Sequence, residues 1–406
     1  MISLLVRHPT GVHREKIMSM LSRSSFMRLP GVLLALCLAS TFAMAAANPI
    51  LITNDDVVGP LPGTVSFYTI GGDGSLTFLQ RLKTGGSGIG GGFFGTNRVA
   101  VLNGTQQCFY VSNASTTDIA GIDANTLKAG GRARGSSSDT GAGNGIGLAM
   151  NSQFLYASFT DNSTIGTFQV LPGCGLQFVG DTAVAGVQNG TLDAMAVHGN
   201  VLVATYGDGS IESFDITSGT PVSRGDKQNS SAFDGATYPN GIDITSDGRF
   251  AIFGDTATSM IIEVSDMSSG KLSPTHVFRL GRAISSSNIM LSPDETILYI
   301  ANTQGDTVSA AFFDKATGRV SRGCTSGNLK GYVSGWSYLS GIGLQQTTGN
   351  GGGVYVAEFG APSGIAIVNL TVNGGTCTMA EAPTSPVADP HSPGLLSIGT
   401  FPPRSF

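Results

Sequence analysis

A short apolar run that leads into polar residues recurs seven times along this 406-residue chain. The runs cover residues 51–55, 109–113, 155–159, 202–206, 251–255, 298–302 and 354–358. Their first residues are separated by 58, 46, 47, 49, 47 and 56 positions. A period near this length in a strand-rich chain is typical of a β-propeller, in which each repeat forms one small antiparallel sheet, or blade. We therefore predict an all-β fold, a seven-bladed β-propeller of four-stranded antiparallel blades.

One repeat shows the predicted blade in full. Residues 240–245 and 249–254 have strand-like alternation on either side of a tight Ser-Asp-Gly turn, and two further strands are expected at 260–265 and 271–280. The chain contains 58 glycines and only 12% charged residues. Many short strands need many tight turns, and tight turns favour glycine because it tolerates positive φ. The composition therefore agrees with the predicted blades.

The two ends of the chain are predicted to close the ring. Inner strands are expected to begin near residues 97, 144, 191, 240, 287 and 341, one fewer than the seven second strands. The missing inner strand is predicted at residues 393–398, paired with residues 49–53. Such closure removes exposed sheet edges, which otherwise promote aggregation. The alternative is a six-bladed ring in which residues 49–53 form an extra strand.

Residues 1–47 have the pattern of a signal peptide region, and residues 48–406 are predicted to form one propeller domain. Arg23 and Arg28 precede an apolar stretch at residues 29–39, and Ala43-Met-Ala45 fits a cleavage site. A membrane anchor is the alternative, but the stretch is short for a span. We expect an exported protein, periplasmic or extracellular, with no stable membrane span after cleavage.

The charge of the predicted mature chain excludes one class of partner. Without residues 1–47 the net charge is −9, and no basic cluster remains. Nucleic-acid binding needs lysines and arginines to neutralise phosphates. We therefore expect no nucleic-acid partner.

Four cysteines remain after cleavage: Cys108, Cys174, Cys324 and Cys377. An even number in an oxidising compartment predicts two disulfides. The repeat register favours Cys108–Cys174 and Cys324–Cys377, each joining neighbouring blades. Buried free thiols are the alternative. The spacing fits no structural zinc site.

Residues 239–248 and 291–302 carry a family resemblance. Their Pro-Asn-Gly-Ile-Asp-Ile-Thr-Ser-Asp-Gly and Leu-Ser-Pro-Asp-Glu-Thr-Ile-Leu-Tyr-Ile-Ala-Asn segments resemble the repeat of the lactonase-type seven-bladed propellers. That group includes 6-phosphogluconolactonases, muconate cycloisomerases and YVTN-repeat surface proteins. The resemblance covers nearly all of residues 49–400 and implies the propeller fold. If this chain is an enzyme, it implies a lactone hydrolase or a cycloisomerase-like enzyme.

The starts of the inner strands and the ends of the second strands are predicted to meet at one mouth of the central channel. A ring of amides and carboxylates there can bind a sugar, a lactone or a cation such as calcium, and no other cofactor is expected. In the alternative interpretation these side chains only cap turns. The candidate ligand-binding residues are Asn97, Asn144, Asn240, Asn288, Asp208, Asp255, Asn302 and Trp336.

Lactone hydrolysis needs a base or an activated water and a donor for the developing oxyanion. Candidate catalytic residues are Glu358, His391, Arg98 and Arg282. Related lactonases are thought to use His, Arg and Glu, but a Pro-His pair expected in a middle inner strand is Pro239-Asn240 here. Two functions therefore remain. The first is a module that binds a small polar ligand or an envelope protein; the alternative is a lactonase acting on a sugar-type lactone.

Overall fold

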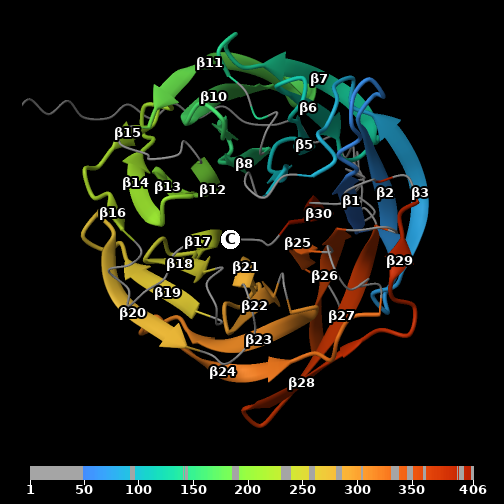
Figure 1. The fold of residues 1–406 in the computed structure, drawn as a ribbon, viewed down its shortest axis with the longest axis vertical. Coiled ribbons are helices and arrows are strands. Elements are labelled where there is room, and N and C mark those ends of the chain that lie inside the picture. The colour runs from blue at the N-terminus through green and yellow to red at the C-terminus, as the bar shows by residue number, and fades with distance from the viewer. Residues whose placement is uncertain are drawn as a thin grey trace, which may run out of the picture. The chain divides into compact units, whose positions relative to one another are not determined.

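Seven four-stranded antiparallel blades are arranged in a ring in the computed structural model of this chain (Figure 1). The structure describes residues 49–403 except 92–96, 140, 142–144, 185–191, 230–238, 256–260, 280–285, 303–304, 331–337, 345–350, 360–362, 391 and 393–396. The predicted signal peptide region lies outside these residues. No helix among them is long and apolar enough to cross a membrane.

In each blade the strands are given from the channel outward. Blade 1 contains Ser397–Phe401 (β30), Ile50–Asn54 (β1), Thr64–Ile70 (β2) and Leu76–Lys83 (β3). Blade 2 contains Val99–Asn103 (β4), Gln107–Asn113 (β5), Asp118–Asp123 (β6) and Lys128–Arg134 (β7). Blade 3 contains Ile146–Met150 (β8), Phe154–Phe159 (β9), Thr164–Leu171 (β10) and Gly175–Ala183 (β11), with a 3-10 turn at Pro172–Cys174 (η1).

Blade 4 contains Leu192–His198 (β12), Val201–Tyr206 (β13) and Ser210–Asp215 (β14), and its outer strand is split into Val222–Ser223 (β15) and Gln228–Asn229 (β16). Blade 5 contains Pro239–Ile244 (β17), Phe250–Asp255 (β18), Ile261–Asp266 (β19) and Ser273–Arg279 (β20). Blade 6 contains Ser286–Leu291 (β21), Ile297–Asn302 (β22), Thr307–Asp314 (β23) and Arg319–Thr325 (β24). Blade 7 contains Tyr338–Leu344 (β25), Gly351–Phe359 (β26) and Gly364–Asn373 (β27), with a split outer strand, Thr376–Glu381 (β28) and Val387–Ala388 (β29).

The two ends of the chain close the ring in blade 1, which excludes the six-bladed alternative. Residue Ile50 pairs with Phe401 and Asn54 pairs with Ser397. Of the predicted closing strand, residues 393–398, positions 393–396 lie outside the described residues, and the described strand runs from Ser397 to Phe401. All five of its residues are buried, so burial sets its position.

The core lies between the blades. Among the described residues the buried apolar side chains form seven clusters, and each cluster joins two adjacent blades. Alternate residues of one second strand therefore contribute to different clusters: Tyr355 packs toward blade 1, whereas Val354 and Val356 pack toward blade 6. This alternation fixes which neighbour each side chain faces.

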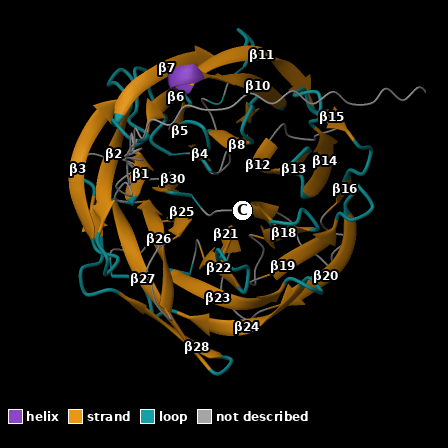
Figure 2. Ribbon diagram, turned by 180° about the vertical axis from the view of Figure 1, so that it is seen from behind, coloured by secondary structure: helices purple, strands orange, loops and turns teal. Residues whose placement is uncertain are grey.

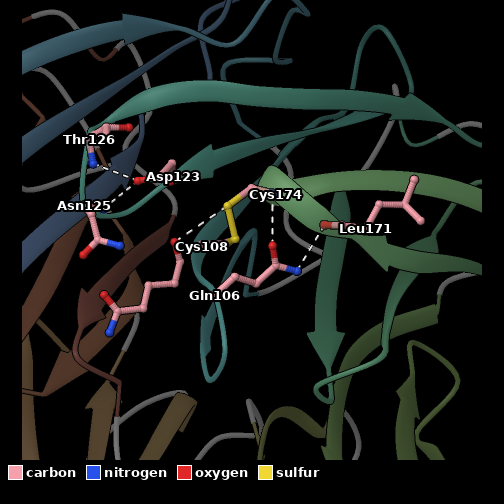
Figure 3. Close-up of a disulfide and its surroundings, with 8 residues drawn as sticks. Gln106, Cys108, Asp123, Asn125, Thr126, Leu171 and Cys174 are labelled. Carbon is pink, nitrogen blue, oxygen red and sulfur yellow. Dashed lines mark hydrogen bonds between the residues drawn. A yellow bond between two sulfur atoms is a disulfide. The ribbon is translucent and has the colours of Figure 1, made fainter.

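Both predicted disulfides are present and both join adjacent blades. Cys108 on β5 is bonded to Cys174 at η1, with the Cα atoms 5.7 Å apart (Figure 3). Cys324 on β24 is bonded to Cys377 on β28, with the Cα atoms 5.5 Å apart. Gly121 is needed at the first contact, because a Cβ there would overlap the carbonyl oxygen of Cys174.

Candidate functional site

We call the face at which the inner strands begin and the second strands end the mouth face, and the other one the opposite face. In blades 4 to 7 the inner strand has a β-bulge at its mouth end. The register shifts between Leu192 and Met195, Pro239 and Gly241, Ser286 and Asn288, and Leu339 and Gly341. The polar residues in these bulges are Asp193, Asn240, Ser287 and Ser340. Bulges at the rims of barrels re-aim side chains and are frequent beside functional sites.

The residues at the mouth ends of the second strands, which we call the cap residues, are largely buried between blades. The set is Asp55, Asn113, Phe159, Tyr206, Asp255, Asn302 and Glu358. The described side chains of this set are no more than 2% exposed. The alternation along each strand points a cap residue toward the preceding blade. Glu358, for example, lies on the same strand face as Val354 and Val356, which contact blade 6.

Most polar cap residues are hydrogen-bonded to the third or fourth strand of their own blade. Asp55 accepts hydrogen bonds from Thr64 Oγ1 at 2.6 Å and from Arg81 Nε at 3.2 Å. Asn302 Nδ2 donates to Thr307 Oγ1 at 3.1 Å and to Ser309 Oγ at 2.9 Å. These pairs hold the mouth end of a blade together.

Asn113 provides a direct test of this capping role. Its Nδ2 donates to Asp118 Oδ1 at 2.7 Å and its Oδ1 accepts from Thr84 Oγ1 at 2.7 Å. Replacing Asn113 with alanine removes both bonds: Thr84 Oγ1 can still donate to the Gly63 carbonyl oxygen at 3.0 Å, but the buried Asp118 carboxylate loses its donor. We expect a loss of about 1–3 kcal/mol in the free energy of unfolding. Urea denaturation measures the loss. Asn125→Ala, in an exposed turn of the same blade, is the matched control, and equal stability of both variants would contradict the capping role.

Glu358 differs from the other described polar cap residues because neither of its carboxylate oxygens has a hydrogen-bond partner among the described residues. The register explains the difference. In each blade the third strand has one residue opposite the cap residue and another two positions further on. These residues are Thr64 and Ser66 in blade 1 and Thr307 and Ser309 in blade 6. In blade 7 they are a glycine and an alanine. A carboxyl group that is only 2% exposed is thereby left without a donor.

The electrostatic surroundings of Glu358 also differ from those of Asp55. Burial and the nearby Glu381 carboxylate raise the pKa of Glu358 from 4.5 to about 7. Asp55 has Arg81 beside it, although burial also raises the pKa of Asp55. A carboxyl group with a pKa near 7 can release and accept protons at neutral pH.

Arg98 lies at the mouth end of β4 and forms a buried ion pair with Asp56. The side chains are 2% and 1% exposed, and Arg98 Nη1 lies 3.1 Å from Asp56 Oδ2. The same carboxylate accepts hydrogen bonds from the backbone nitrogens of Ile89 and Gly91, at 3.1 and 2.9 Å. Asp56 therefore anchors part of the glycine-rich segment that precedes β4.

The predicted ligand-binding residues are spread around the mouth face. Asn240 and Asn288 are buried at the starts of β17 and β21. Asn97 is half-buried, and its backbone carbonyl oxygen accepts a hydrogen bond from the Leu148 backbone nitrogen at 2.9 Å. Asp208 lies in a turn, where it accepts from the Ser210 nitrogen at 2.9 Å and lies 3.9 Å from Lys227 Nζ. The predicted residues Asn144, Arg282, Trp336 and His391 and the side chain of Asp255 lie outside the described part of the chain.

Asp208 is the one carboxylate of the predicted ligand-binding set whose side chain lies within the described residues. Asp208 is engaged by Ser210 and Lys227, as given above. Within the described residues no group of three or more His, Cys, Asp or Glu side chains gathers closely enough to hold a metal ion. Calcium binding at this face stays a prediction.

Two residues of this face, Asp56 and Asp193, were not predicted from the sequence. Asp56 follows the first apolar run directly, so the Asp55-Asp56 doublet was a usable signal for a second, separately paired carboxylate. Asp193 occupies the bulge of blade 4 as Asn240 does in blade 5. Asp193 and Asn240 are each the second residue of their inner strand, so an alignment of β12 with β17 identifies Asp193.

The comparisons with known proteins agree with this fold. The family model described as lactonase, 7-bladed beta-propeller, matches residues 108–382. No curated protein sequence matches the chain. A functionally unknown protein from Desulfotomaculum acetoxidans DSM 771 superposes with a TM-score of 0.63 at 15% identity, over 87% of this chain and 99% of that one.

Two further structures are similar in fold. A protein from Bacteroides uniformis assigned as a 6-phosphogluconolactonase has a TM-score of 0.53 at 13% identity, over 67% of this chain and 80% of that one. Its counterpart from Bacteroides fragilis has a TM-score of 0.52 at 14% identity, over 67% and 79%. At these identities the likeness concerns the fold alone.

Proposed function

Because the chain belongs to the seven-bladed β-propeller lactonase family, we propose that it is an exported envelope protein that binds a partner at its mouth face. The partner is a small polar ligand, such as a sugar or a lactone, or another envelope protein. The proposal is carried by the bulges of blades 4 to 7, which place polar residues on four adjacent inner strands. Regular pairing would need no such interruption, and bulges of this kind are frequent at binding sites.

The hydrogen bonding of the cap residues favours binding over catalysis for most of the mouth face. Asp55, Asn113 and Asn302 are already bonded within their blades. They serve as a rigid support for a site, because a bonded and buried group is not free to exchange protons with a substrate. Export is supported by the signal-like residues 1–47 and by the two disulfides, which are typical of oxidising compartments.

Calorimetric titration of the disulfide-bonded chain, residues 48–406, tests this proposal. The titrants are gluconolactone, gluconate and neutral sugars, each with and without calcium. We expect binding that Asn240→Ala weakens at least tenfold, since one good polar contact contributes about 1.4 kcal/mol or more. Asn125→Ala is the control for folding. Binding that is indifferent to Asn240→Ala would place the ligand elsewhere and refute the mouth site.

Hydrolysis of a lactone is the second candidate function, and Glu358 is the observation that favours it. Its carboxylate has no hydrogen-bond partner among the described residues, and this and its pKa of about 7 suit a general base. In this mechanism the carboxylate takes a proton from a water molecule as the water oxygen bonds to the lactone carbonyl carbon. The carbonyl–ring oxygen bond then breaks, and the proton passes from Glu358 to the leaving alkoxide. Glu358 thereby returns to its starting state.

Hydrolysis of gluconolactone and its 6-phosphate, corrected for the uncatalysed rate, tests this second function. Glu358→Gln is expected to lower kcat about 10²–10⁴-fold, the usual contribution of a general base. His391→Ala is measured beside it. Glu295→Gln is the matched control, because Glu295 is equally buried but lies on the opposite face, paired with Lys315 at 2.9 Å. No turnover by the folded, oxidised wild-type chain would reject the lactonase for these substrates.

A further inference from the structure

The opposite face carries a separate groove where blades 2 and 3 meet. It is lined by the turns between the inner and second strands of both blades, near Gln106 and Gln153, and by η1. Figure 2 shows η1 beside β10 and β11. The groove has a volume of about 640 Å³, within the range of small-molecule sites. Because these turns lie at the far ends of the inner strands, the groove is independent of the mouth face.

The lining of this groove is polar but uncharged. It carries three glutamines, a serine and a threonine together with the apolar Phe154, Val170 and Pro172, and no lysine, arginine, aspartate, glutamate or histidine. An amide both donates and accepts hydrogen bonds, as a sugar hydroxyl does. A phosphate or carboxylate ligand would need positive charge, which this lining does not supply. We propose that the groove binds a neutral saccharide.

Gln106 gives the groove a fixed wall. Its Oε1 accepts a hydrogen bond from the Cys174 nitrogen at 3.3 Å and its Nε2 donates to the Leu171 carbonyl oxygen at 3.1 Å (Figure 3). The Cys108–Cys174 disulfide lies directly beside these bonds and joins the two blades that form the groove. A wall held in this way loses little conformational entropy when a ligand binds.

Two other amides remain available to a ligand. Gln153 and Gln169 are exposed, and their side chains form no hydrogen bond within the described residues. The Phe154 side chain, by contrast, packs toward blade 4, so Phe154 closes the end of the groove rather than its wall against blade 2. This ring is half-buried and packs over Gly219 in the adjacent turn of blade 4, where any Cβ would contact it at 2.5 Å. Amides that are free to donate and accept suit the hydroxyls of one sugar unit.

Saturation-transfer NMR and calorimetry with maltotriose, cellotriose and chitotriose test the saccharide groove, using the oxidised chain of residues 48–406. We expect at least one trisaccharide to bind in the millimolar range or tighter. The double variant Gln153→Ala/Gln169→Ala is expected to raise the Kd at least tenfold. Gln177→Ala, exposed on β11 of the same blade, is the matched control and leaves the Kd unchanged.

The remaining outcomes separate this groove from the mouth face. Binding that survives the double variant but is lost with Asn240→Ala belongs to the mouth face and overturns the groove proposal. Equal or tighter binding of glucose 6-phosphate, abolished by the double variant, would overturn the neutral class of ligand. No binding of any of the three trisaccharides by folded wild-type protein would also overturn it, without bearing on the lactone titrations.

Discussion

Replacing Glu358 with glutamine is expected to remove a loss of stability that the wild-type protein shows between pH 4.5 and 7. The folded protein holds the Glu358 proton to about pH 7, whereas the unfolded chain releases it near pH 4.5. In this window the folded state binds more protons, so its stability falls as the pH rises. A rise in pKa of this size corresponds to about 3 kcal/mol. Urea unfolding of both proteins at pH 4.5, 6 and 8 measures it.

The comparison must be made as a difference between proteins, because burial also raises the pKa values of Asp55 and Asp56. Asp55 and Asp56 contribute equally to the change of unfolding free energy with pH in the wild type and in the variant. We expect the stability of Glu358→Gln relative to wild type to improve by about 3 kcal/mol from pH 4.5 to pH 8, with little further change above pH 8. Parallel curves for the two proteins would show that Glu358 does not titrate in this range.

Glu295→Gln is a control of opposite sign. The ion pair and hydrogen bonds with Lys315 and Ser246 lower the pKa of Glu295, despite its burial. Its contribution to stability is therefore present at neutral pH and is lost on acidification, and the variant should be less stable than wild type at pH 7. Two buried Glu→Gln changes in one fold are then expected to shift stability at pH 7–8 in opposite directions.

Stability gained together with activity or binding lost would mark Glu358 as a functional residue. A cap residue with a structural role alone, such as Asn113, loses stability when it is truncated. A buried carboxyl group without a hydrogen-bond partner lowers the stability of the fold. Such a group is expected where the function of the protein depends on it.

The blade pattern could be predicted from the sequence because it depends on local rules. Alternating strands, tight turns and a regular period identified the second strands, and the same register placed Cys108 beside Cys174 and Cys324 beside Cys377. Even the closure by the C-terminal strand followed from one missing inner strand. Each of these features repeats, so one uncertain boundary does not change the result.

The site was less predictable because it depends on which neighbour each side chain faces. The ring of polar strand ends was expected around the channel mouth, and the structure places its described members between blades instead. The availability of Glu358 depends on the Gly364 and Ala366 positions of the next strand, whose significance appears only once the register is known. Likewise, the partner of Arg98 lies 42 residues earlier in the chain and is brought close by the packing of blade 1 on blade 2.

Replacing Arg98 with methionine is expected to destabilise the protein by about 3–5 kcal/mol, the usual cost of leaving one partner of a buried ion pair without the other. The Asp56 carboxylate would remain 1% exposed, held by the backbone nitrogens of Ile89 and Gly91. Urea unfolding measures the loss. Hydrogen exchange at the Ile89 and Gly91 amides should become faster, because the carboxylate that orients them would be protonated or displaced.

The double variant Arg98→Met/Asp56→Asn distinguishes lost charge pairing from lost packing. Asparagine tolerates the φ of +47° that Asp56 adopts, so the backbone remains compatible. We expect the double variant to recover at least half of the stability lost in Arg98→Met, since no buried charge is left unpaired. No recovery would mean that Arg98 acts mainly through the volume it fills.

The destabilisation caused by Arg98→Met is also expected to depend on pH. Burial raises the pKa of Asp56 and the Arg98 guanidinium opposes that rise, so removing Arg98 must raise the pKa again. A raised carboxyl pKa costs stability as the pH increases, so the variant should be more destabilised at pH 8 than at pH 5. An Arg98 that served only as an oxyanion donor would lower turnover without this pH-dependent loss. The same residue can therefore be assigned to the scaffold or to the chemistry by one pair of unfolding curves.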